Sequence, residues 1–249
     1  METGQRAEVR DLRASLDAVI GAKVTNGAEL VRAIARRRRE TTLSTTIEPL
    51  DALLGGGLAR GKTTEIAGRG ERYSIVMAVL AAATSIGEAA ALIDLGDHFD
   101  PQLGEAAGID LRRMLWVRPK TLKEAVMAAE IIGATGVQLV VVECSGRLQP
   151  VRSVDRLKPV ATRRVPDATW VRLARMAEAY GCTILVSAPY ALTGTTSEAM
   201  VLSYASRARW LGSGRSPRVL AGVETRLRLE KHRHKRAGES ATVFFKAVP

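Results

Sequence analysis

The stretch from Gly55 to Met77, GGGLARGKTTEIAGRGERYSIVM, decides which fold the chain takes. Its residues Gly56, Gly61, Lys62 and Thr63 match the G-x-x-x-x-G-K-T pattern of a phosphate-binding loop. Such a loop works only between a buried strand and a helix, where backbone N–H groups and the helix N-terminus converge on the phosphates. Here the apolar strand TTEIAG follows Lys62 instead of preceding it, so the pattern lies at the wrong end of the strand.

The required order of strand, glycine turn and helix occurs one step later along the chain. TTEIAG is the predicted strand, GRGER the turn and YSIVMAVLAAATSIG the helix. At the position of the loop's Gly-Lys-Thr this chain has Glu71-Arg72-Tyr73-Ser74. Arg72 can hold the charge of a phosphate, but Glu71 repels it and the Tyr73 phenol replaces the small hydroxyl that meets Mg²⁺. The sequence therefore predicts a degenerate phosphate loop.

Length and composition indicate a globular α/β protein. The chain has 249 residues, 46% of them apolar, and no apolar run that approaches the roughly eighteen residues of a membrane span. The N-terminus METGQRAEVRDLR has no apolar stretch like that of a signal peptide, so we expect a cytoplasmic protein without membrane contact. Cys144 and Cys182 each adjoin an apolar run, which favours buried reduced thiols over a disulfide or a metal site.

Hydrophobic periodicity predicts two parts. Residues 1–44 show apolar residues at helical spacing around the breaker GAKVTNG, which indicates a helical N-terminal arm. Residues 45–249 form the predicted core domain, in which strands alternate with helices from residue 62 onward. This alternation is typical of a mainly parallel sheet with helices on both faces. After the strand CTILVSA the chain turns to the strands ARARWLG, RVLAGVETRLRLE and ATVFFKAV, so we expect a meander that closes the edge of the sheet.

Four stretches in order resemble the RecA recombinase family, over roughly residues 45–246. STTIEPLDALLGGGLARGKTTEIAG resembles the lead-in to that family's phosphate loop, LIDLGDHFDP its second core strand, LVVVECSGRLQP its Walker B strand, and AGVETRLRLEKHRHKRAGESATVFF its closing hairpin. The resemblance implies a RecA-like α/β core with a twisted, mainly parallel sheet flanked by helices.

The positions where the chain departs from this family define a degenerate nucleotide site. The family's phosphate-loop Lys-Thr falls on Arg72 and Tyr73, its catalytic Glu falls near Gly96, and its Walker B Asp falls on Glu143. Together with Gly68, which interrupts any helix from Thr63, these are the predicted site residues. Glu143 is open to two interpretations, a metal-facing charge or a buried carboxylate bonded to backbone. We expect no ATP hydrolysis, no cofactor and no metal; the alternative is an active ATPase that uses Lys62 and Thr63.

Two basic segments are the predicted surfaces for DNA or a protein partner. The resemblance places the family's first DNA-binding loop within residues 150–166 and its second at about residues 190–206, which contain no Lys or Arg. Residues 205–249 carry eleven Lys and Arg against three acids. Such a concentration of positive charge favours binding to nucleic acid or another acidic surface. The alternative is that these cations only keep an edge strand soluble. The candidate binding cations are Arg152, Arg156, Lys158, Arg163, Arg164, Arg228, Lys231, Arg233, Lys235 and Arg236.

The combination of a RecA-like core, a degenerate nucleotide site, a helical arm and a basic closing hairpin looks like the ImuA group. These are RecA-like accessory proteins of bacterial SOS mutagenesis cassettes. The resemblance implies a role in the DNA-damage response and translesion synthesis, with RecA and the polymerase proteins of the cassette as partners and single-stranded DNA as a further candidate. A RecA-like cell-division inhibitor remains an alternative.

Overall fold

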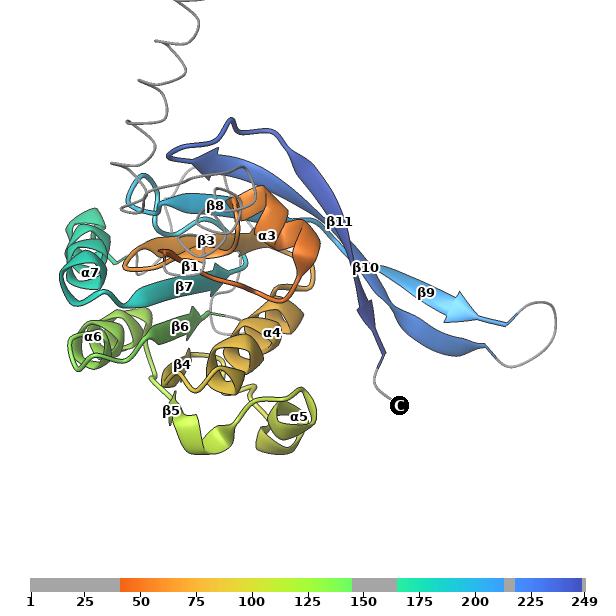
Figure 1. The fold of residues 1–249 in the computed structure, drawn as a ribbon, viewed down its shortest axis with the longest axis horizontal. Helices are drawn as coiled ribbons and strands as arrows, with labels where there is room; N and C mark the ends of the chain where they lie inside the picture. Colours follow the sequence, from red (N-terminus) through yellow and green to blue (C-terminus); the bar gives the residue numbers. More distant parts are fainter. Residues whose placement is uncertain (1–40, 145–164, 213–217, 248–249) are drawn as a thin grey trace, which may run out of the picture. The chain divides into compact units, whose positions relative to one another are not determined.

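A mainly parallel β-sheet forms the centre of the protein (Figure 1). The computed structural model describes residues 41–144, 165–212 and 218–247, nearly all of them in Leu43–Pro249, the second of two compact units. Residues 1–40, which hold most of the predicted helical arm, lie outside the described residues. Among the residues that are described, no helix has the length and apolar character that crossing a membrane requires.

Nine strands of the described part build the large sheet, in the order β11-β10-β8-β3-β7-β6-β4-β5, with β9 paired to β10 beside this path. Neighbouring strands from β8 to β5 are parallel, whereas β10 runs antiparallel to β8, β9 and β11. A separate two-stranded sheet pairs β1 with β2. The strands are β1 (Thr42–Leu43), β2 (Leu58–Ala59), β3 (Thr63–Gly68), β4 (Ala90–Asp94), β5 (Met114–Val117), β6 (Leu139–Glu143), β7 (Thr183–Ala188), β8 (Ala199–Ser203), β9 (Arg207–Leu211), β10 (Val219–His232) and β11 (Ser240–Lys246).

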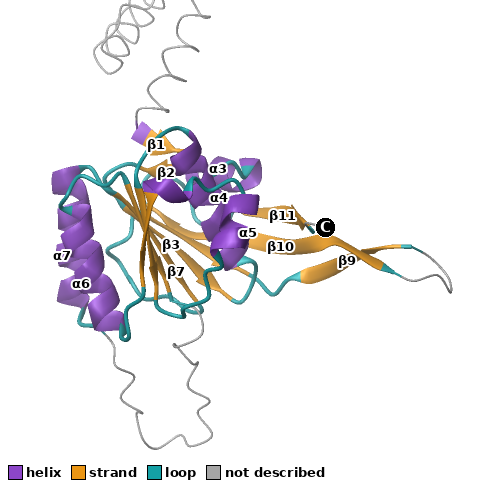
Figure 2. Cartoon of the chain, turned by 90° about the horizontal axis from the view of Figure 1, so that it is seen from below, coloured by secondary structure: helices purple, strands orange, loops and turns teal. Residues whose placement is uncertain are grey.

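Helices cover both faces of the parallel part of the sheet (Figure 2). The helices are α3 (Glu48–Leu54), α4 (Arg72–Ser85), α5 (Pro101–Ala106), α6 (Leu122–Gly133) and α7 (Asp167–Tyr180), with a short 3₁₀ helix η1 (Leu111–Arg113). The strands β3, β4, β6 and β7 are buried along their whole length, as expected for parallel strands enclosed on two sides. The predicted α/β class, with antiparallel closing strands, is confirmed.

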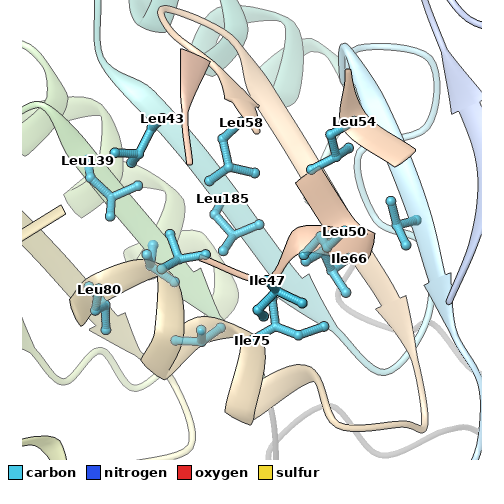
Figure 3. Close-up of a cluster of buried hydrophobic side chains, with 14 of the residues drawn as sticks. Leu43, Ile47, Leu50, Leu54, Leu58, Ile66, Ile75, Leu80, Leu139 and Leu185 are labelled. Carbon is cyan, nitrogen blue, oxygen red and sulfur yellow. The ribbon is translucent and has the colours of Figure 1, made fainter. Parts of the chain in front are cut away.

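One apolar cluster joins α3, α4 and one face of the sheet (Figure 3). Leu50 of α3, Ile66 of β3, Ile75 of α4 and Leu185 of β7 are all fully buried in it. Burying a side chain of this size contributes about 1.5–3 kcal/mol, so the cluster fixes where α4 lies on the sheet.

A second cluster packs α6 and α7 on the opposite face and includes Cys144 and Cys182. Both cysteines are free and buried, as the sequence predicted. Burial raises the pKa of the Cys182 thiol to about 11.

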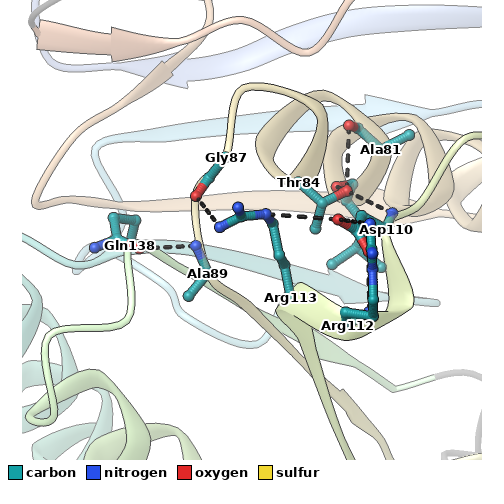
Figure 4. A network of polar contacts seen from close by, with 9 residues as sticks. Ala81, Thr84, Gly87, Ala89, Asp110, Arg112, Arg113 and Gln138 are labelled. Carbon is teal, nitrogen blue, oxygen red and sulfur yellow. Dashed lines mark hydrogen bonds and ion pairs between the residues drawn. The ribbon is translucent and has the colours of Figure 1, made fainter.

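A polar network joins the far end of α4 and the turn that follows it to η1 and its N-cap (Figure 4). The Thr84 hydroxyl accepts a hydrogen bond from the Asp110 backbone N–H at 3.1 Å, and the Arg113 guanidinium donates to the Gly87 carbonyl at 2.7 Å. The first bond satisfies the backbone N–H at the N-cap of η1 and the second satisfies a carbonyl in the turn that follows α4, so together they fix the distal end of that helix. The opposite end of α4 lies at the candidate site.

Candidate functional site

The candidate site lies where β3 ends at Gly68 and α4 begins at Arg72. Gly68 has φ +117°, in the left-handed region, and a Cβ at this position would overlap the carbonyl oxygen of Ser203. Only glycine fits there without strain. The strand, turn and helix follow one another in the order that the sequence predicted one step after the G-K-T pattern.

Lys62 and Thr63 lie at the opposite, amino end of β3. The Lys62 ammonium donates a hydrogen bond to Glu178 of α7 at 2.5 Å, and the Lys62 carbonyl accepts one from the Ile184 N–H of β7 at 2.9 Å. Thr63 opens the buried strand and is 3% exposed. The G-x-x-x-x-G-K-T match is therefore a turn that leads into β3, with its lysine tied to α7.

Backbone amides in the turn after β3 already have acceptors within the protein. The N–H groups of Arg69 and Gly70 both donate to the carbonyl oxygen of Ser203, at 3.0 and 3.2 Å. In a phosphate loop, amides at these positions point at the anion. Glu71 precedes the helix and accepts a hydrogen bond from the Ser74 hydroxyl at 3.0 Å, so a carboxylate already stands at the positive end of the helix dipole.

Arg72 turns its guanidinium toward the carboxyl ends of the central strands. Its Nε donates to the Gly68 carbonyl at 2.6 Å, and its Nη1 donates to the Ser187 hydroxyl of β7 at 2.9 Å. The same Nη1 lies 3.5 Å from Oε1 of Glu143, which ends β6 and is fully buried. Because a buried charge is costly unless it is paired and hydrogen-bonded, the Arg72 side chain is committed to groups of the protein itself.

A row of polar side chains ends three adjacent strands beside Arg72. The strand register places Asp94 next to Glu143 and Glu143 next to Ser187. Asp94 is 1% exposed and accepts a hydrogen bond from the Phe99 N–H at 2.8 Å. Burial, followed by the charges of Asp94 and Glu143, raises the pKa of Tyr73 to about 12.

Gly96, in the turn after β4, contributes no side chain to this row. Of the acids beside it, Asp94 faces the Phe99 amide, and Asp97 lies 3.8 Å from the Arg118 guanidinium. Across the described ranges, no three His, Cys, Asp or Glu side chains form a group that could hold a metal ion. Of the predicted site residues, Arg72 contacts Gly68 and Glu143, whereas the Tyr73 hydroxyl donates to the His98 carbonyl at 3.4 Å.

Glu65, which the sequence interpretation did not single out, anchors the segment that follows β7. Its carboxylate is fully buried and accepts hydrogen bonds from the N–H groups of Leu192 and Thr193 at 2.5 and 3.2 Å. A glutamate inside the apolar strand TTEIAG was the available signal, because a buried carboxylate requires donors.

This anchoring changes the interpretation of residues 190–206, the predicted counterpart of the second DNA-binding loop. Residues 199–203 form β8, which pairs with β3 inside the sheet, and the Glu198 N–H donates to the Thr63 carbonyl at 2.7 Å. The burial of β8 alternates along the strand, as expected for a strand with one face on the core. Much of the segment is therefore part of the folded core and not a loop that is free to contact DNA.

Two cations of the basic closing hairpin support the fold. The Lys231 ammonium donates to the carbonyls of Thr195 and Ser197 at 2.7 and 2.5 Å. The Lys235 ammonium donates to the carbonyls of Ala52 and Leu53, in the last turn of α3, at 2.7 and 3.0 Å. A lysine ammonium near a helix C-terminus donates to the last carbonyls of the helix and interacts favourably with the helix dipole. These contacts give Lys231 and Lys235 a structural role, and their role in binding DNA or a partner stays a prediction.

The remaining predicted binding cations differ in their surroundings. Arg228 lies 3.5 Å from Glu230, and Arg233 lies 3.7 Å from the nearly buried Glu198. Arg236 is exposed and forms no ion pair within the part of the chain that the structure describes. The basic residues of the predicted first DNA-binding loop lie outside the described residues; these are Arg152, Arg156, Lys158, Arg163 and Arg164.

The fold defines a class of protein, an α/β protein with a mainly parallel sheet in which a buried strand, a glycine turn and a helix follow one another at the candidate site. The model of the RecA N-terminal domain matches residues 14–157, more than half of the chain, and the chain belongs to this family. It is similar to the RecA protein of Synechocystis sp., with 29% identity over 124 residues, which is 49% of this chain and 35% of that protein. It is also similar to the RecA protein of Clostridium acetobutylicum, with 32% identity over 117 residues, 45% of this chain and 34% of that one.

These matches span about a third of the length of the curated relatives. Among solved structures, the chain resembles the crystal structure of the RadB recombinase, with a TM-score of 0.57 and 20% identity, covering 81% of this chain and 94% of that one. At this identity the likeness supports a common fold.

Proposed function

We propose that this chain is a RecA-family accessory protein that does not hydrolyse ATP and that acts in DNA-damage-induced repair and translesion mutagenesis, as the ImuA group does. The observation that carries the proposal is the placement of Arg72. Its guanidinium bonds to Gly68, Ser187 and Glu143 at the carboxyl edge of the sheet. This side chain stands at the family's phosphate-loop lysine, so a protein cation engaged with protein groups replaces one that would engage a phosphate.

Three further features support loss of nucleotide chemistry. The Ser203 carbonyl takes the amide hydrogens of Arg69 and Gly70, and Glu71 places a negative charge at the start of α4. A triphosphate entering this turn would have to displace the carbonyl and would meet the carboxylate. Gly96 provides no carboxylate for activating water where the family has its catalytic Glu.

The proposed role is therefore binding, with RecA and the polymerase proteins of a mutagenesis cassette as partners. Similarity to RecA proteins supports a function close to recombination and repair, and the net charge of +11 supports an acidic partner or single-stranded DNA. DNA contact through phosphates alone would weaken steeply as salt is raised.

An ATP hydrolysis assay tests the first part of the proposal. The purified protein is measured with and without single-stranded DNA, beside the Lys62→Ala variant. We expect no phosphate release above buffer for either protein. A turnover of about one per second, typical of a working enzyme, that disappears in Lys62→Ala would instead establish the ATPase alternative.

A pull-down with purified RecA, with the cassette polymerase proteins and with a cell-division protein distinguishes the accessory role from the division-inhibitor alternative. We expect capture of RecA and of at least one polymerase protein at physiological salt. Capture of the division protein alone would contradict the proposal.

A further inference from the structure

The β9 strand and the beginning of β10 form a hairpin that extends away from the helix-covered part of the sheet (Figure 1). We define residues 207–211 and 218–224 as the β9–β10 arm; residues 213–217 lie outside the described residues. All five residues of β9 are exposed. The strand pairs with β10 on one edge only, so the other edge has no strand partner in the described sheet.

The arm presents large apolar side chains on both faces. Trp210 pairs across the strands with Leu220, and Leu211 pairs with Val219. Because successive residues of a strand point to opposite faces, the Trp210 pair and the Leu211 pair lie on opposite sides of the arm. Exposed fractions are 54% for Trp210, 63% for Leu211, 64% for Val219 and 38% for Leu220.

This pattern is unusual for a strand pair in water. An antiparallel sheet normally buries its apolar side chains on one face and presents polar ones on the other. Contiguous exposed apolar side chains on a folded protein mark an interaction site. Since both faces carry such side chains, a single flat surface would cover only half of them, whereas a groove that receives the arm would bury both pairs.

Charge on the arm indicates what kind of groove fits. The arm carries Arg207, Arg209 and Arg218 with one acid, Glu224, which lies 3.2 Å from Arg209. Arg207 and Arg218 form no ion pair among the described residues. Trp and Arg together, without Lys, are typical of protein interfaces. An acidic partner complements this surface, whereas a second copy of this chain, with a net charge of +11, would be repelled.

A protein groove fits these residues better than a nucleic acid does. Single-stranded nucleic acid gains affinity from phosphate contacts and from bases stacked on aromatic rings. Trp210 offers one such ring, but Leu211, Val219 and Leu220 offer none. Aliphatic side chains gain binding energy mainly when other apolar atoms remove them from water.

We propose that the β9–β10 arm inserts into an apolar groove of a protein partner whose rim carries carboxylates. Trp210, Leu211, Val219 and Leu220, which we call the apolar tip, anchor the contact. Arg207 and Arg218 orient the arm by pairing with the carboxylates on the rim of the groove. The inference rests on the proposed function in one respect, namely that RecA is the partner on which it is tested.

The test measures binding of purified RecA to the full chain, with the chain immobilised and RecA in solution. Two double variants remove the tip, Trp210→Ser with Leu220→Ser and Leu211→Ser with Val219→Ser. A third variant, Arg207→Glu with Arg218→Glu, reverses the rim charges. The matched control is Ile131→Ser on α6, which removes an apolar side chain that is 66% exposed but lies outside the arm.

We expect each tip variant to weaken RecA binding about 30-fold or more, as for interface anchors, with an unchanged melting temperature. The charge-reversed variant should bind about tenfold more weakly and lose its salt dependence, while Ile131→Ser binds as the wild type does. Equal binding by the tip variants and the wild type overturns the arm proposal and leaves the proposed function standing. Failure of the wild type to bind RecA overturns both.

Three other outcomes also overturn the arm proposal. In the first, the tip variants lose binding to a single-stranded oligonucleotide but keep their affinity for RecA, which would make the arm a nucleic-acid-binding surface. In the second, deleting residues 1–40 strongly increases hydrogen exchange in residues 207–211 of the isolated protein, which would mean that residues 1–40 cover the arm. In the third, the wild type dimerises through the apolar tip at micromolar concentration, which would mean that a second copy of this chain covers the arm.

Discussion

Replacing Arg72 with Met tests whether the closed site contributes to folding stability. The change removes the donor to Gly68, the donor to Ser187 and the cation beside Glu143, whose side chain is fully buried. Removing one partner of a buried ion pair costs about 3–5 kcal/mol, because the other charge stays buried without its counterion. We therefore expect Arg72→Met to lower the free energy of unfolding by about 3–5 kcal/mol.

Urea unfolding followed by circular dichroism measures this loss, with the m-value checked so that only stability is compared. Arg69→Met is the matched control, since Arg69 lies in the same turn and its side chain is exposed, and we expect a change within about 0.5 kcal/mol. Adding Glu143→Gln to Arg72→Met should recover about 1–3 kcal/mol, because it removes the buried charge. An Arg72→Met protein as stable as the Arg69→Met control would refute the reasoning.

Three further predictions concern Tyr73, Lys235 and Gly70. Burial and the nearby carboxylates raise the pKa of Tyr73 from 10.0 to about 12, so its contribution to stability is complete below pH 10 and is lost as the pH rises from 10 through about 12. Ultraviolet titration should therefore show a late-titrating signal that Tyr73→Phe removes, and a signal that Tyr73→Phe leaves unchanged would contradict this cause. Lys235→Met should cost about 1–2 kcal/mol in urea unfolding, because the last turn of α3 loses a charged donor, whereas Arg236→Met should cost almost nothing. Gly70→Ala should cost about 1–3 kcal/mol, since its Cβ would overlap the Tyr204 carbonyl; an unchanged midpoint would show that the turn adapts.

The sequence by itself determined the fold class and the location of the candidate site. Strand and helix periods alternate in a way that only a mainly parallel, two-sided sheet satisfies, and the glycines at 68 and 70 separate β3 from α4. The order of strand and glycines also predicts that the G-x-x-x-x-G-K-T pattern precedes β3, and Lys62 does lie at the amino end of that strand and not at the carboxyl end, where a phosphate loop begins. Such features are local, since they depend on side-chain period and on the backbone freedom of glycine.

Tertiary structure alone decided what the polar and charged side chains do. Arg72 meets Glu143 and Ser187 across gaps of 71 and 115 positions in the chain, and Lys235 reaches the end of α3. Sequence predicted Lys235 as a binding cation because its neighbours in sequence are basic, but its carbonyl partners come from a helix far away in the chain. A buried or half-buried charge takes whichever partners the packed sheet and helices bring within a few ångströms, and linear spacing does not encode that choice.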